Sequence, residues 1–412
     1  MSLVRSLFLD LNSFFASCEQ QLNPELRGKP TAVVPTMTDR TCCIAVSYEA
    51  RKYGVKTGVG VGEAKRLCPG INLVEGWHEH YIDFHHKIIE AVNSVMPVEE
   101  VCSIDEMHCT LSPPDRAREA ARGLATQVKQ AIYDQVGECL RSSIGIAPNP
   151  FLAKIASNMQ KPDGLVLIGK DELPERLYPL ELEDLPGIGR NMHRRLQKCG
   201  IRTVRQLCSL SRQEMKLAWK SILGEQYWLM LRGDVYQKKE PVRRTVGHSH
   251  VLPPSLRNDE GSYAVLVRLL HKAAARLRRM KCSASRMEIK LKYLGEMPSW
   301  KVKPYLGRVQ DTCTLLHHLN RHWQQRPPGG TPLQAAITLL DIRPAAQIPL
   351  PLFEEDRRGK RATEAMDLVN EKLGLNSLYF ASMHDTREAA PMRIAFTRIP
   401  DVKAEMPRPV QV

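Results

Sequence analysis

Three carboxylates lie among apolar residues of the kind that form buried strands. Asp10 closes the apolar run of residues 4–11, and Asp105 and Glu106 stand side by side within residues 101–109. An acid on a buried strand is costly unless it is paired or bound to a metal ion. Carboxylate oxygens suit Mg²⁺, and two such ions can support phosphoryl transfer. The acids are therefore candidates for a metal site, although ordinary salt-bridged acids at strand ends would also explain them.

These acids need a scaffold, and strand and helix patterns alternate through the first 165 residues. Besides the two acid-bearing strands, short apolar runs predict strands at residues 32–34, 43–46 and 141–146. Helical spacing or glycine stops predict helices at residues 14–21, 48–54, 81–95 and 116–135. This alternation is typical of an α/β or split βαβ layer, which can bring strand ends from distant parts of the chain together.

The pattern changes after this layer. Residues 173–231 look helical with glycine punctuation, and residues 237–244 are charged and aperiodic, as in a linker. A second α+β unit follows, with strands predicted at 245–251, 286–293 and 333–340 and helices at 261–280 and 312–322. The last seventy residues hold Pro-rich connections and one predicted helix, residues 363–373.

Length and composition limit the class of protein. The 412 residues imply two to four domains, and 43% hydrophobic and 25% charged residues are typical of globular chains. No apolar run is long enough for a membrane span, and the N-terminal run meets an acid too soon for a secretory signal, so we expect a cytoplasmic protein. Eleven scattered cysteines without a CxxC pair argue against a zinc ribbon or a disulfide scaffold.

The net charge of +14 is unevenly distributed. Residues 1–165 carry a net charge of −2, residues 166–244 carry +6, residues 245–345 carry +10 and residues 346–412 are neutral. A basic block joined to a slightly acidic one suggests that the basic part holds a polyanion while the other does carboxylate chemistry. A solvated basic surface is the simpler explanation of the charge taken alone.

Four segments together resemble the Y-family translesion DNA polymerases of the DinB (polymerase IV) type. They are DLNSFFAS from Asp10, YEARKYGV from Tyr48, SIDE from Ser103 and FLAKIASNMQKPDG from Phe151. Their order and spacing match the family, and the resemblance runs from residue 4 to about residue 345. It implies that Asp10, Asp105 and Glu106 are catalytic and bind two Mg²⁺ ions, with the carbonyl of Leu11 as a further ligand.

The resemblance also implies a nucleotide site. Tyr48 and Arg51, three residues apart on one helix face, would donate with Lys161 to the triphosphate oxygens of a deoxynucleoside triphosphate. Phe15 matches the steric gate, an aromatic ring under the sugar that clashes with a ribose 2′-hydroxyl, whereas Phe14 is expected to pack in the core. Ala45 departs from the family pattern, because many relatives have a phosphate-holding threonine there.

Two further regions are candidates for DNA contact. Gly187, Gly189 and Arg190 lie in LPGIGR, a helix-hairpin-helix pattern whose glycine turn lets backbone N–H groups approach a phosphate. A plain helical turn is the alternative, but the pattern falls where the family has its thumb hairpin. In the +10 segment, Arg243, Arg244 and His248 flank or occupy a strand that could follow a DNA backbone.

A final motif lies beyond the basic block. Residues 347–353, QIPLPLF, resemble the sliding-clamp-binding peptide of bacterial polymerases, with Gln347, Leu350, Leu352 and Phe353 as anchors. Its spacing is longer than the usual pentapeptide, and packing against the preceding domain is the alternative.

The predicted architecture is α+β and multidomain, a right-hand polymerase with a ferredoxin-like palm. We expect the palm at residues 1–11 and 77–165, small fingers at 12–76, a helical helix-hairpin-helix thumb at 166–240, a linker at 241–244, an α+β little finger at 245–345 and a clamp-binding tail at 346–412. The implied function is low-fidelity, template-directed DNA synthesis past damaged bases, on primer-template DNA, by a monomer. A catalytically inactive Y-family scaffold and a helix-hairpin-helix nuclease are the alternatives.

Overall fold

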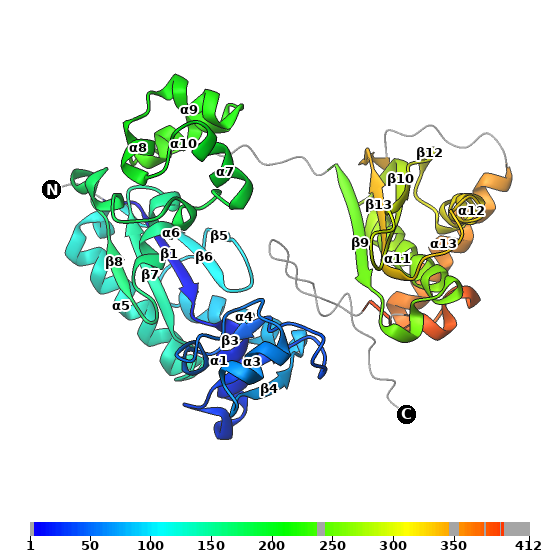
Figure 1. Ribbon diagram of the computed structural model, residues 1–412, viewed down its shortest axis with the longest axis horizontal. Coiled ribbons are helices and arrows are strands. Elements are labelled where there is room, and N and C mark those ends of the chain that lie inside the picture. Colours follow the sequence, from blue (N-terminus) through cyan, green and yellow to red (C-terminus); the bar gives the residue numbers. More distant parts are fainter. Residues whose placement is uncertain (1–3, 237–243, 346–353, 375, 388, 391–412) are drawn as a thin grey trace. The chain divides into compact units, whose positions relative to one another are not determined.

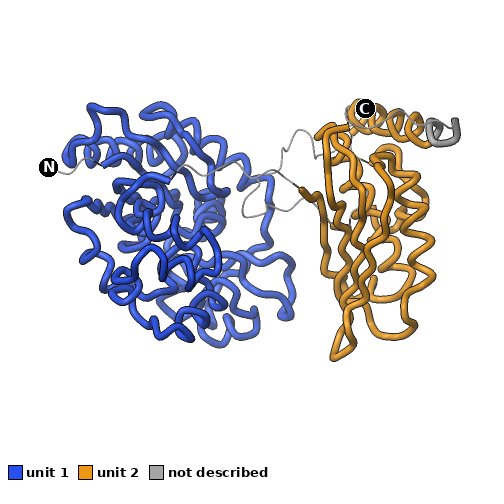
Figure 2. The backbone as a smooth tube through the Cα atoms, turned by 90° about the horizontal axis from the view of Figure 1, so that it is seen from above, with its two compact units in different colours: residues 1–238, 393–400 blue, residues 239–392, 401–412 orange. Residues whose placement is uncertain are grey.

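The computed structural model describes residues 4–236, 244–345, 354–374, 376–387 and 389–390. The chain divides between Lys238 and Lys239 into two compact units, drawn in blue and orange in Figure 2. The division falls inside the charged stretch 237–244 that the sequence predicts as a linker. An α+β multidomain fold is thus confirmed.

The first unit is built on a five-stranded sheet in the order β5-β6-β1-β7-β8 (Figure 1). Its strands are β1 (Ser6–Leu11), β5 (Glu100–Val101), β6 (Glu106–Thr110), β7 (Ser142–Ala147) and β8 (Leu165–Leu167). The central β1 is buried at every residue and pairs antiparallel with β6 and β7. Helix α6 (Pro150–Met159) packs on β1 and β7, while α5 (Arg118–Gln135) packs on β8 and on α4 (His78–Asn93). The apolar strand at the N-terminus therefore forms the middle of the sheet.

The predicted strand 101–109 is interrupted by a tight turn. The N–H groups of Cys102 and Ser103 both donate to the carbonyl of Glu106, at 2.9 and 3.1 Å. The Ser103 hydroxyl lies 2.5 Å from Asp105 Oδ1, and such local side-chain bonding competes with strand pairing. Asp105 consequently lies in a turn at the start of β6, and the expectation of one continuous strand was wrong.

A smaller three-stranded sheet follows β1. In it β2 (Thr31–Val34) pairs antiparallel with β3 (Ala45–Val46) and parallel with β4 (Asn72–Glu75). The helices around it are α1 (Phe14–Leu22), α2 (Tyr48–Arg51) and α3 (Val61–Leu67). The sequence analysis missed α3 and β4, because both are short and only partly buried. It also extended α2 to Gly54, where the structure has a turn with a positive φ of 85°.

Four helices end the first unit, as the glycine-punctuated pattern predicts. They are α7 (Arg190–Lys198), α8 (Val204–Ser209), α9 (Arg212–Trp219) and α10 (Leu223–Leu231). Reciprocal side-chain and backbone hydrogen bonds cap α8 at Thr203 and α9 at Ser211. Their buried side chains share one hydrophobic core with α6 and with Phe8 of β1. This common core fixes the helical part to the main sheet.

The second unit has one antiparallel sheet with helices on one side (Figure 1). Its main order is β11-β10-β13-β9, and β12 and β14 also pair with β10. The strands are β9 (Thr245–Val251), β10 (Cys282–Tyr293), β11 (Trp300–Val302), β12 (Tyr305–Val309), β13 (Pro332–Leu340) and β14 (Arg343–Pro344). Helix α11 (Asp259–Arg279) packs across β9 and β13, and α12 (Thr312–Trp323) packs against α11. The other sheet face carries the alternate, more exposed side chains.

The residues after the predicted clamp motif also pack onto the second unit. Helix α13 (Glu354–Leu373) lies against α12, and the 3₁₀ segment Ala381–Thr386 lies against α11. Two hydrogen bonds, of 2.6 and 2.7 Å, join the Arg278 guanidinium to the Asp367 carboxylate, and Met383 is fully buried in the core. The expectation that everything after residue 345 is a tail was therefore wrong. The helix-end cation Arg278 holds α13 in place.

Short 3₁₀ helices complete the described structure. They lie at Pro24–Leu26, Pro113–Arg116, Lys170–Glu172, Glu175–Leu177, Leu182–Asp184 and Pro254–Leu256.

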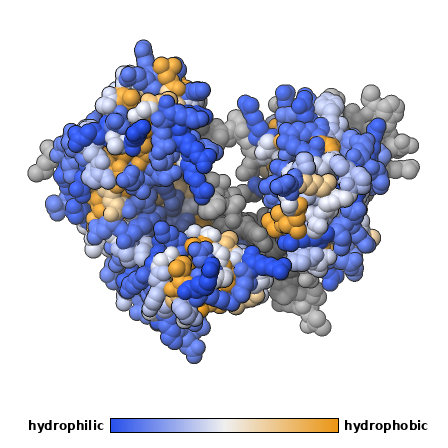
Figure 3. Space-filling view, viewed as in Figure 1, coloured by the Kyte–Doolittle hydropathy of each residue, from blue (hydrophilic) through white to orange (hydrophobic). Residues whose placement is uncertain are grey.

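Among the helices that the structure describes, none has the length and apolar character needed to cross a bilayer. The surface in Figure 3 is mainly hydrophilic, and its hydrophobic patches are small and separate.

The second unit is expected to lose stability in mild acid through His271 of α11. Burial, followed by the charges of Arg268 and Arg278, lowers the pKa of His271 to about 4, although the Asp367 carboxylate opposes this shift. The unfolded histidine, with a pKa of 6.5, takes up its proton first as the pH falls, so folding weakens between pH 6.5 and 4. The loss is at most roughly 3 kcal/mol.

Denaturant unfolding of the full chain, followed by tryptophan fluorescence across this pH window, measures the effect. The variant His271→Leu should show a flatter pH dependence of the unfolding free energy than the wild type. Replacing the exposed His317 of α12 with leucine is the matched control, and it should leave the slope unchanged. Equal slopes in wild type and His271→Leu would contradict the prediction.

Candidate active site

The fold brings the three predicted acids together at one end of the main sheet. Asp10 at the end of β1 is the direct cross-strand partner of Glu106 at the start of β6, so the two side chains share a face. Asp105 precedes Glu106, and its carbonyl accepts a hydrogen bond of 2.9 Å from the N–H of Leu11. Acids almost a hundred residues apart in the chain therefore become neighbours through the β1–β6 register.

The site concentrates negative charge where water is scarce. Burial, followed by the charges of Glu106 and Asp105, raises the pKa of Asp10 to about 6, although the Lys161 ammonium opposes this shift. Burial likewise raises the pKa of Asp105, against the hydrogen bond from Ser103. These shifts show that the acids interact electrostatically and that additional positive charge would stabilise their ionised forms.

Two lysines supply part of that positive charge. Lys161 Nζ lies 2.7 Å from Asp10 Oδ1, and Lys154 of α6 forms an ion pair with Glu106 while it covers the Phe8 ring at 4.9 Å. Within the described ranges, no three His, Cys, Asp or Glu side chains converge as ready metal ligands. The ammonium groups show that these acids accept cationic partners, and the donors are hard carboxylate oxygens. The residues present therefore fit a hard divalent ion in charge and in chemistry.

Phe15 lies on the first turn of α1, close behind β1. Its ring stacks on the Tyr81 ring of α4, with centroids 4.2 Å apart and planes 12° apart. The fully buried Tyr81 donates a hydrogen bond of 2.7 Å from its hydroxyl to Glu19 Oε1, and His78 meets both rings edge-on. Phe15 is half-buried while Phe14 is only 3% exposed, so Phe15 has a free surface for a ligand. The sequence analysis missed Tyr81 as the support of this ring.

Tyr48 and Arg51 are brought together on α2, as their spacing predicts. The Arg51 guanidinium lies 4.7 Å from the centroid of the Tyr48 ring. Ser47 caps the helix by accepting the N–H of Ala50. Burial raises the pKa of the Tyr48 hydroxyl, Arg51 lowers it, and Asp10 raises it. Tyr48 thus lies within electrostatic reach of Asp10 and keeps a proton to donate.

Asn12 is a site residue whose structural role sequence reasoning missed. Its Nδ2 donates to Ser143 Oγ at 3.0 Å, and its Oδ1 accepts the N–H of Asp163 at 2.7 Å. Asp163 belongs to the loop that carries Lys161, so Asn12 ties this loop to β1 and β7. A polar residue in an apolar run beside Asp10 was the available signal, but its partner is 151 residues away.

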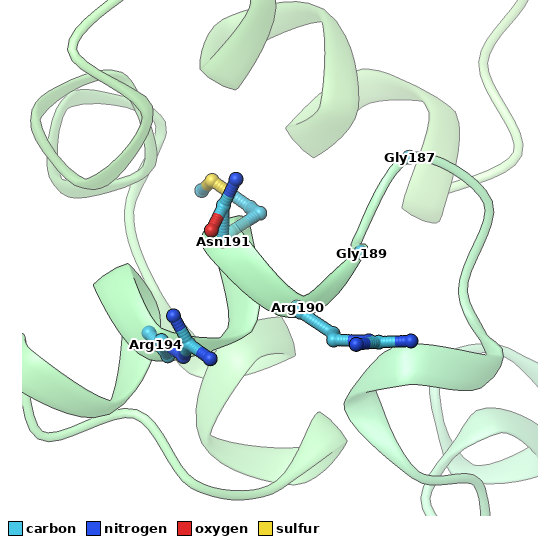
Figure 4. A pocket seen from close by; sticks show the side chains of 6 residues that line it. Gly187, Gly189, Arg190, Asn191 and Arg194 are labelled. Atoms are coloured by element: carbon cyan, nitrogen blue, oxygen red, sulfur yellow. The ribbon is translucent and has the colours of Figure 1, made fainter. Parts of the chain in front are cut away.

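The predicted glycine hairpin precedes α7. Gly187 has a positive φ of 90°, a conformation that favours glycine, and Gly189 is the N-terminal cap of α7. Figure 4 shows Arg190 and Arg194 in the first turns of α7, next to the loop of the two glycines. These residues line an open hollow together with Asn191 and Met192. The hollow combines a glycine turn with two cationic side chains.

The second unit presents cations on its sheet face away from the helices. On β10, exposed or partly exposed positions alternate with the buried Met287, Ile289 and Leu291. Lys301, the cross-strand partner of Lys290, and Lys303 both contact Glu288, at 3.1 and 3.0 Å. The cationic side chains of this open face are Arg286, Lys290, Lys292, Lys301 and Lys303.

The DNA-contact residues predicted in and before β9 do not belong to this open face as a group. His248 of β9 lies opposite the fully buried Ile337, so its side chain is on the helix-covered face and the expectation that it contacts DNA is not supported. Arg244 precedes β9 and is exposed, whereas Arg243 lies outside the described residues. Gln347, Leu350, Leu352 and Phe353 of the predicted clamp motif also lie outside them.

Family models match three successive parts of the chain. The impB/mucB/samB family matches residues 9–158, and the thumb domain of DNA polymerase-iota matches residues 183–234. The impB/mucB/samB family C-terminal domain matches residues 243–350. These ranges contain the three acids, the glycine hairpin with its helices, and the sheet of the second unit with α11 and α12.

Whole-chain comparisons agree with the family models. DNA polymerase IV of Moorella thermoacetica is 31% identical over 385 residues, which cover 89% of this chain and 93% of that protein. A Y-family DNA polymerase chimera of Dbh and Dpo4 is 26% identical, with a TM-score of 0.68 over 82% of this chain and 99% of that one. An insertion ternary complex of Dbh DNA polymerase has the same identity and coverage, with a TM-score of 0.55. The chain therefore belongs to the Y-family of DNA polymerases, in its DinB or DNA polymerase IV type.

Proposed function

We propose that this chain is a translesion DNA polymerase whose catalytic residues are Asp10, Asp105 and Glu106. The observation that carries the proposal is the β1–β6 register, which places Asp10 opposite Glu106 and within electrostatic reach of Asp105 and Tyr48. As in its family, the chain is a DNA-directed DNA polymerase that acts on DNA with nucleotides as substrates. It transfers a deoxynucleotide onto a primer 3′-hydroxyl and releases pyrophosphate.

Polymerases of this family use divalent metal ions, and we assign two Mg²⁺ ions to this site. The carboxylates of Asp10, Asp105 and Glu106 and the carbonyl of Leu11 would hold them. When bound, such ions activate the attacking hydroxyl and stabilise the leaving oxygen. The chain holds the acids together beforehand, by the β1–β6 register and by the lysines that neutralise part of their repulsion.

The incoming nucleotide would lie between the acids and α1. Its phosphate oxygens would accept hydrogen bonds from Tyr48, Arg51 and Lys161. The Lys161 ammonium would then pair with a phosphate in place of the Asp10 carboxylate. The exposed part of the Phe15 ring would lie under the sugar and exclude a 2′-hydroxyl by volume. Ala45 lacks a hydroxyl, so this chain has one phosphate donor fewer than relatives with threonine at that position.

Neither alternative function is favoured. A Y-family scaffold would not need three acids that meet, and a nuclease leaves Phe15 and the Tyr48–Arg51 pair without a role. A primer-extension assay with Mg²⁺ and four deoxynucleotides, on intact and damaged templates, separates the three functions. A polymerase lengthens the primer, a nuclease shortens a strand, and a scaffold changes neither.

The proposed domain boundaries follow the predicted ones, except that the little finger extends to at least residue 390. In this proposal the chain works as a monomer in the cytoplasm, with the five-stranded sheet as palm and the three-stranded sheet as part of the fingers. Gly187, Gly189 and Arg190 would contact a DNA phosphate through backbone N–H groups and the guanidinium. The open sheet face of the second unit, with Arg244 at its edge, would supply further phosphate contacts.

Neutralising the open sheet face is expected to weaken DNA binding in a salt-dependent way. The double variant Lys290→Gln and Lys292→Gln should lower the slope of log affinity against log salt by about 0.9 for each phosphate that is no longer neutralised. Fluorescence anisotropy of a labelled primer-template, measured over a series of salt concentrations, gives this slope. Arg321→Gln, which removes an exposed cation from the helix side, is the control that should keep it. Equal slopes in all proteins would mean that this face does not bind DNA.

The proposed clamp contact predicts that a variant can lose stimulation by the clamp and keep its basal DNA synthesis. Replacing Leu352 and Phe353 together with alanine should abolish stimulation by a sliding clamp on a circular template, because both side chains would be the apolar anchors of an extended peptide. Distributive synthesis on a short primer-template without clamp should remain unchanged. An equal loss in both reactions would show that the two residues support the fold instead.

A further inference from the structure

The turn that carries Asp105 is held by hydrogen bonds from three directions. Within the turn, Cys102 and Ser103 donate to the carbonyl of Glu106, and from β1 Leu11 donates to the carbonyl of Asp105. The third bond comes from a side chain on another element. His85 of α4 places its Nδ1 2.8 Å from the carbonyl oxygen of Ile104, the residue before Asp105.

The chemistry of this contact defines the state of the histidine. A carbonyl oxygen can only accept, so Nδ1 of His85 carries the hydrogen. The ring is 1% exposed, and burial keeps its pKa well below the usual range, so it is a neutral donor at pH 7. A substitution of His85 therefore removes a hydrogen bond and leaves the net charge of the site unchanged.

The helix that carries His85 also carries the support of the sugar gate. Tyr81 lies one helical turn before His85, on the same side of α4, and stacks on Phe15 at 4.2 Å. The Tyr81 hydroxyl is anchored on Glu19 of α1 at 2.7 Å. One face of α4 thus contacts both the ring proposed to select the sugar and the backbone that precedes a proposed metal ligand.

We propose that His85 is a positioning residue that sets the Asp105 carboxylate relative to Phe15 by holding the carbonyl of Ile104. The inference rests on the proposed function, because it takes Asp105 as a metal ligand. The inference goes further than that function, because it makes α4 the element that sets the distance between Phe15 and Asp105. Misplacement of a reacting group by about 1 Å can slow catalysis by about a hundredfold, so a missing anchor at this turn has a measurable consequence.

Two substitutions separate the hydrogen bond from the packing. His85→Asn keeps an amide donor at the same number of bonds from Cα as Nδ1, whereas His85→Leu fills the space without a donor. In single-turnover incorporation, His85→Leu should be slower by about tenfold to a hundredfold, and His85→Asn should recover to within about threefold of wild type. Primer-template affinity should stay unchanged in both. His86→Leu, an exposed neighbour on α4, is the control.

A second readout is independent of turnover. Titration with Mn²⁺ followed by electron paramagnetic resonance should show weaker binding in His85→Leu, and wild-type binding in His85→Asn and His86→Leu. If His85→Leu does not fold, as judged by circular dichroism, His85→Gln replaces it, because its amide is one bond too far out to take the place of Nδ1.

Wild-type rate and Mn²⁺ affinity in His85→Leu would overturn the inference, and so would equal losses in His85→Leu and His85→Asn, which would indicate packing alone. The proposed function fails by a different result, full activity of Asp105→Asn. The two failures are therefore distinguishable.

Discussion

Replacing Asp105 with asparagine, or Glu106 with glutamine, is expected to lower primer extension by at least about a thousandfold. Each change removes one negative charge and keeps the size of the side chain, so the site loses metal affinity with little change in packing. Affinity for primer-template DNA should stay within about threefold, because phosphate contacts dominate binding and the cations proposed to make them are not among these acids. Extension of a labelled primer and anisotropy of the same duplex measure the two quantities.

The chain offers a matched control for these variants. Glu100 on β5 is exposed and close in sequence, but it is not among the acids that meet at Asp10. Glu100→Gln should therefore extend primers at the wild-type rate. Normal extension by Asp105→Asn or Glu106→Gln would show that catalysis uses another site.

Phe15→Ala is expected to make ribonucleotide incorporation more efficient by about a hundredfold, the equivalent of removing a clash of about 3 kcal/mol. The ring stacks on Tyr81 and is partly exposed, so it can exclude a 2′-hydroxyl by its volume. Alanine leaves that volume empty. Incorporation efficiencies for a ribonucleotide and the matching deoxynucleotide, measured opposite the same template base, give the discrimination.

Phe15→Tyr is the control, because it keeps a ring of the same thickness and should keep the discrimination. Circular dichroism should confirm that Phe15→Ala is folded, since the change uncovers part of Tyr81. If Phe15→Ala discriminated between ribonucleotides and deoxynucleotides as well as the wild type, Phe15 would not be the steric gate. Phe14 would be a poor replacement, because it is only 3% exposed and packs in the core.

Local sequence patterns predict many of the elements and the candidate residues that they carry. The apolar run before Asp10, the helix from Phe14 and the glycine turn at Gly187 all follow from local patterns, and the structure has each of them. Such patterns can be read because side-chain periodicity and backbone preference act over a few residues. The order of the four motifs also indicated the protein family, which the comparisons confirm.

Local patterns failed where a longer-range contact decides the outcome. The strand predicted across Asp105 became a turn: bonds within residues 102–106 form it, and hydrogen bonds from Leu11 and His85 hold its backbone to β1 and α4. The strand alternation that favoured His248 as a DNA contact did not reveal which sheet face the helices would cover. The sequence beyond residue 345 predicted a helix, but it predicted neither the packing of that helix against α12 nor the ion pair that joins its Asp367 to Arg278 of α11.

The contacts that hold the site come from the tertiary fold. The bonds of Asn12 to the Lys161 loop, of Lys154 to Glu106 and of His85 to Ile104 each join residues from different elements. None of these bonds has a sequence signature. The register of the sheet and the placement of a helix decide which side chains meet, and neither can be predicted from a short segment of sequence. The acids can therefore be read from the sequence, whereas the geometry that holds them is a property of the whole fold.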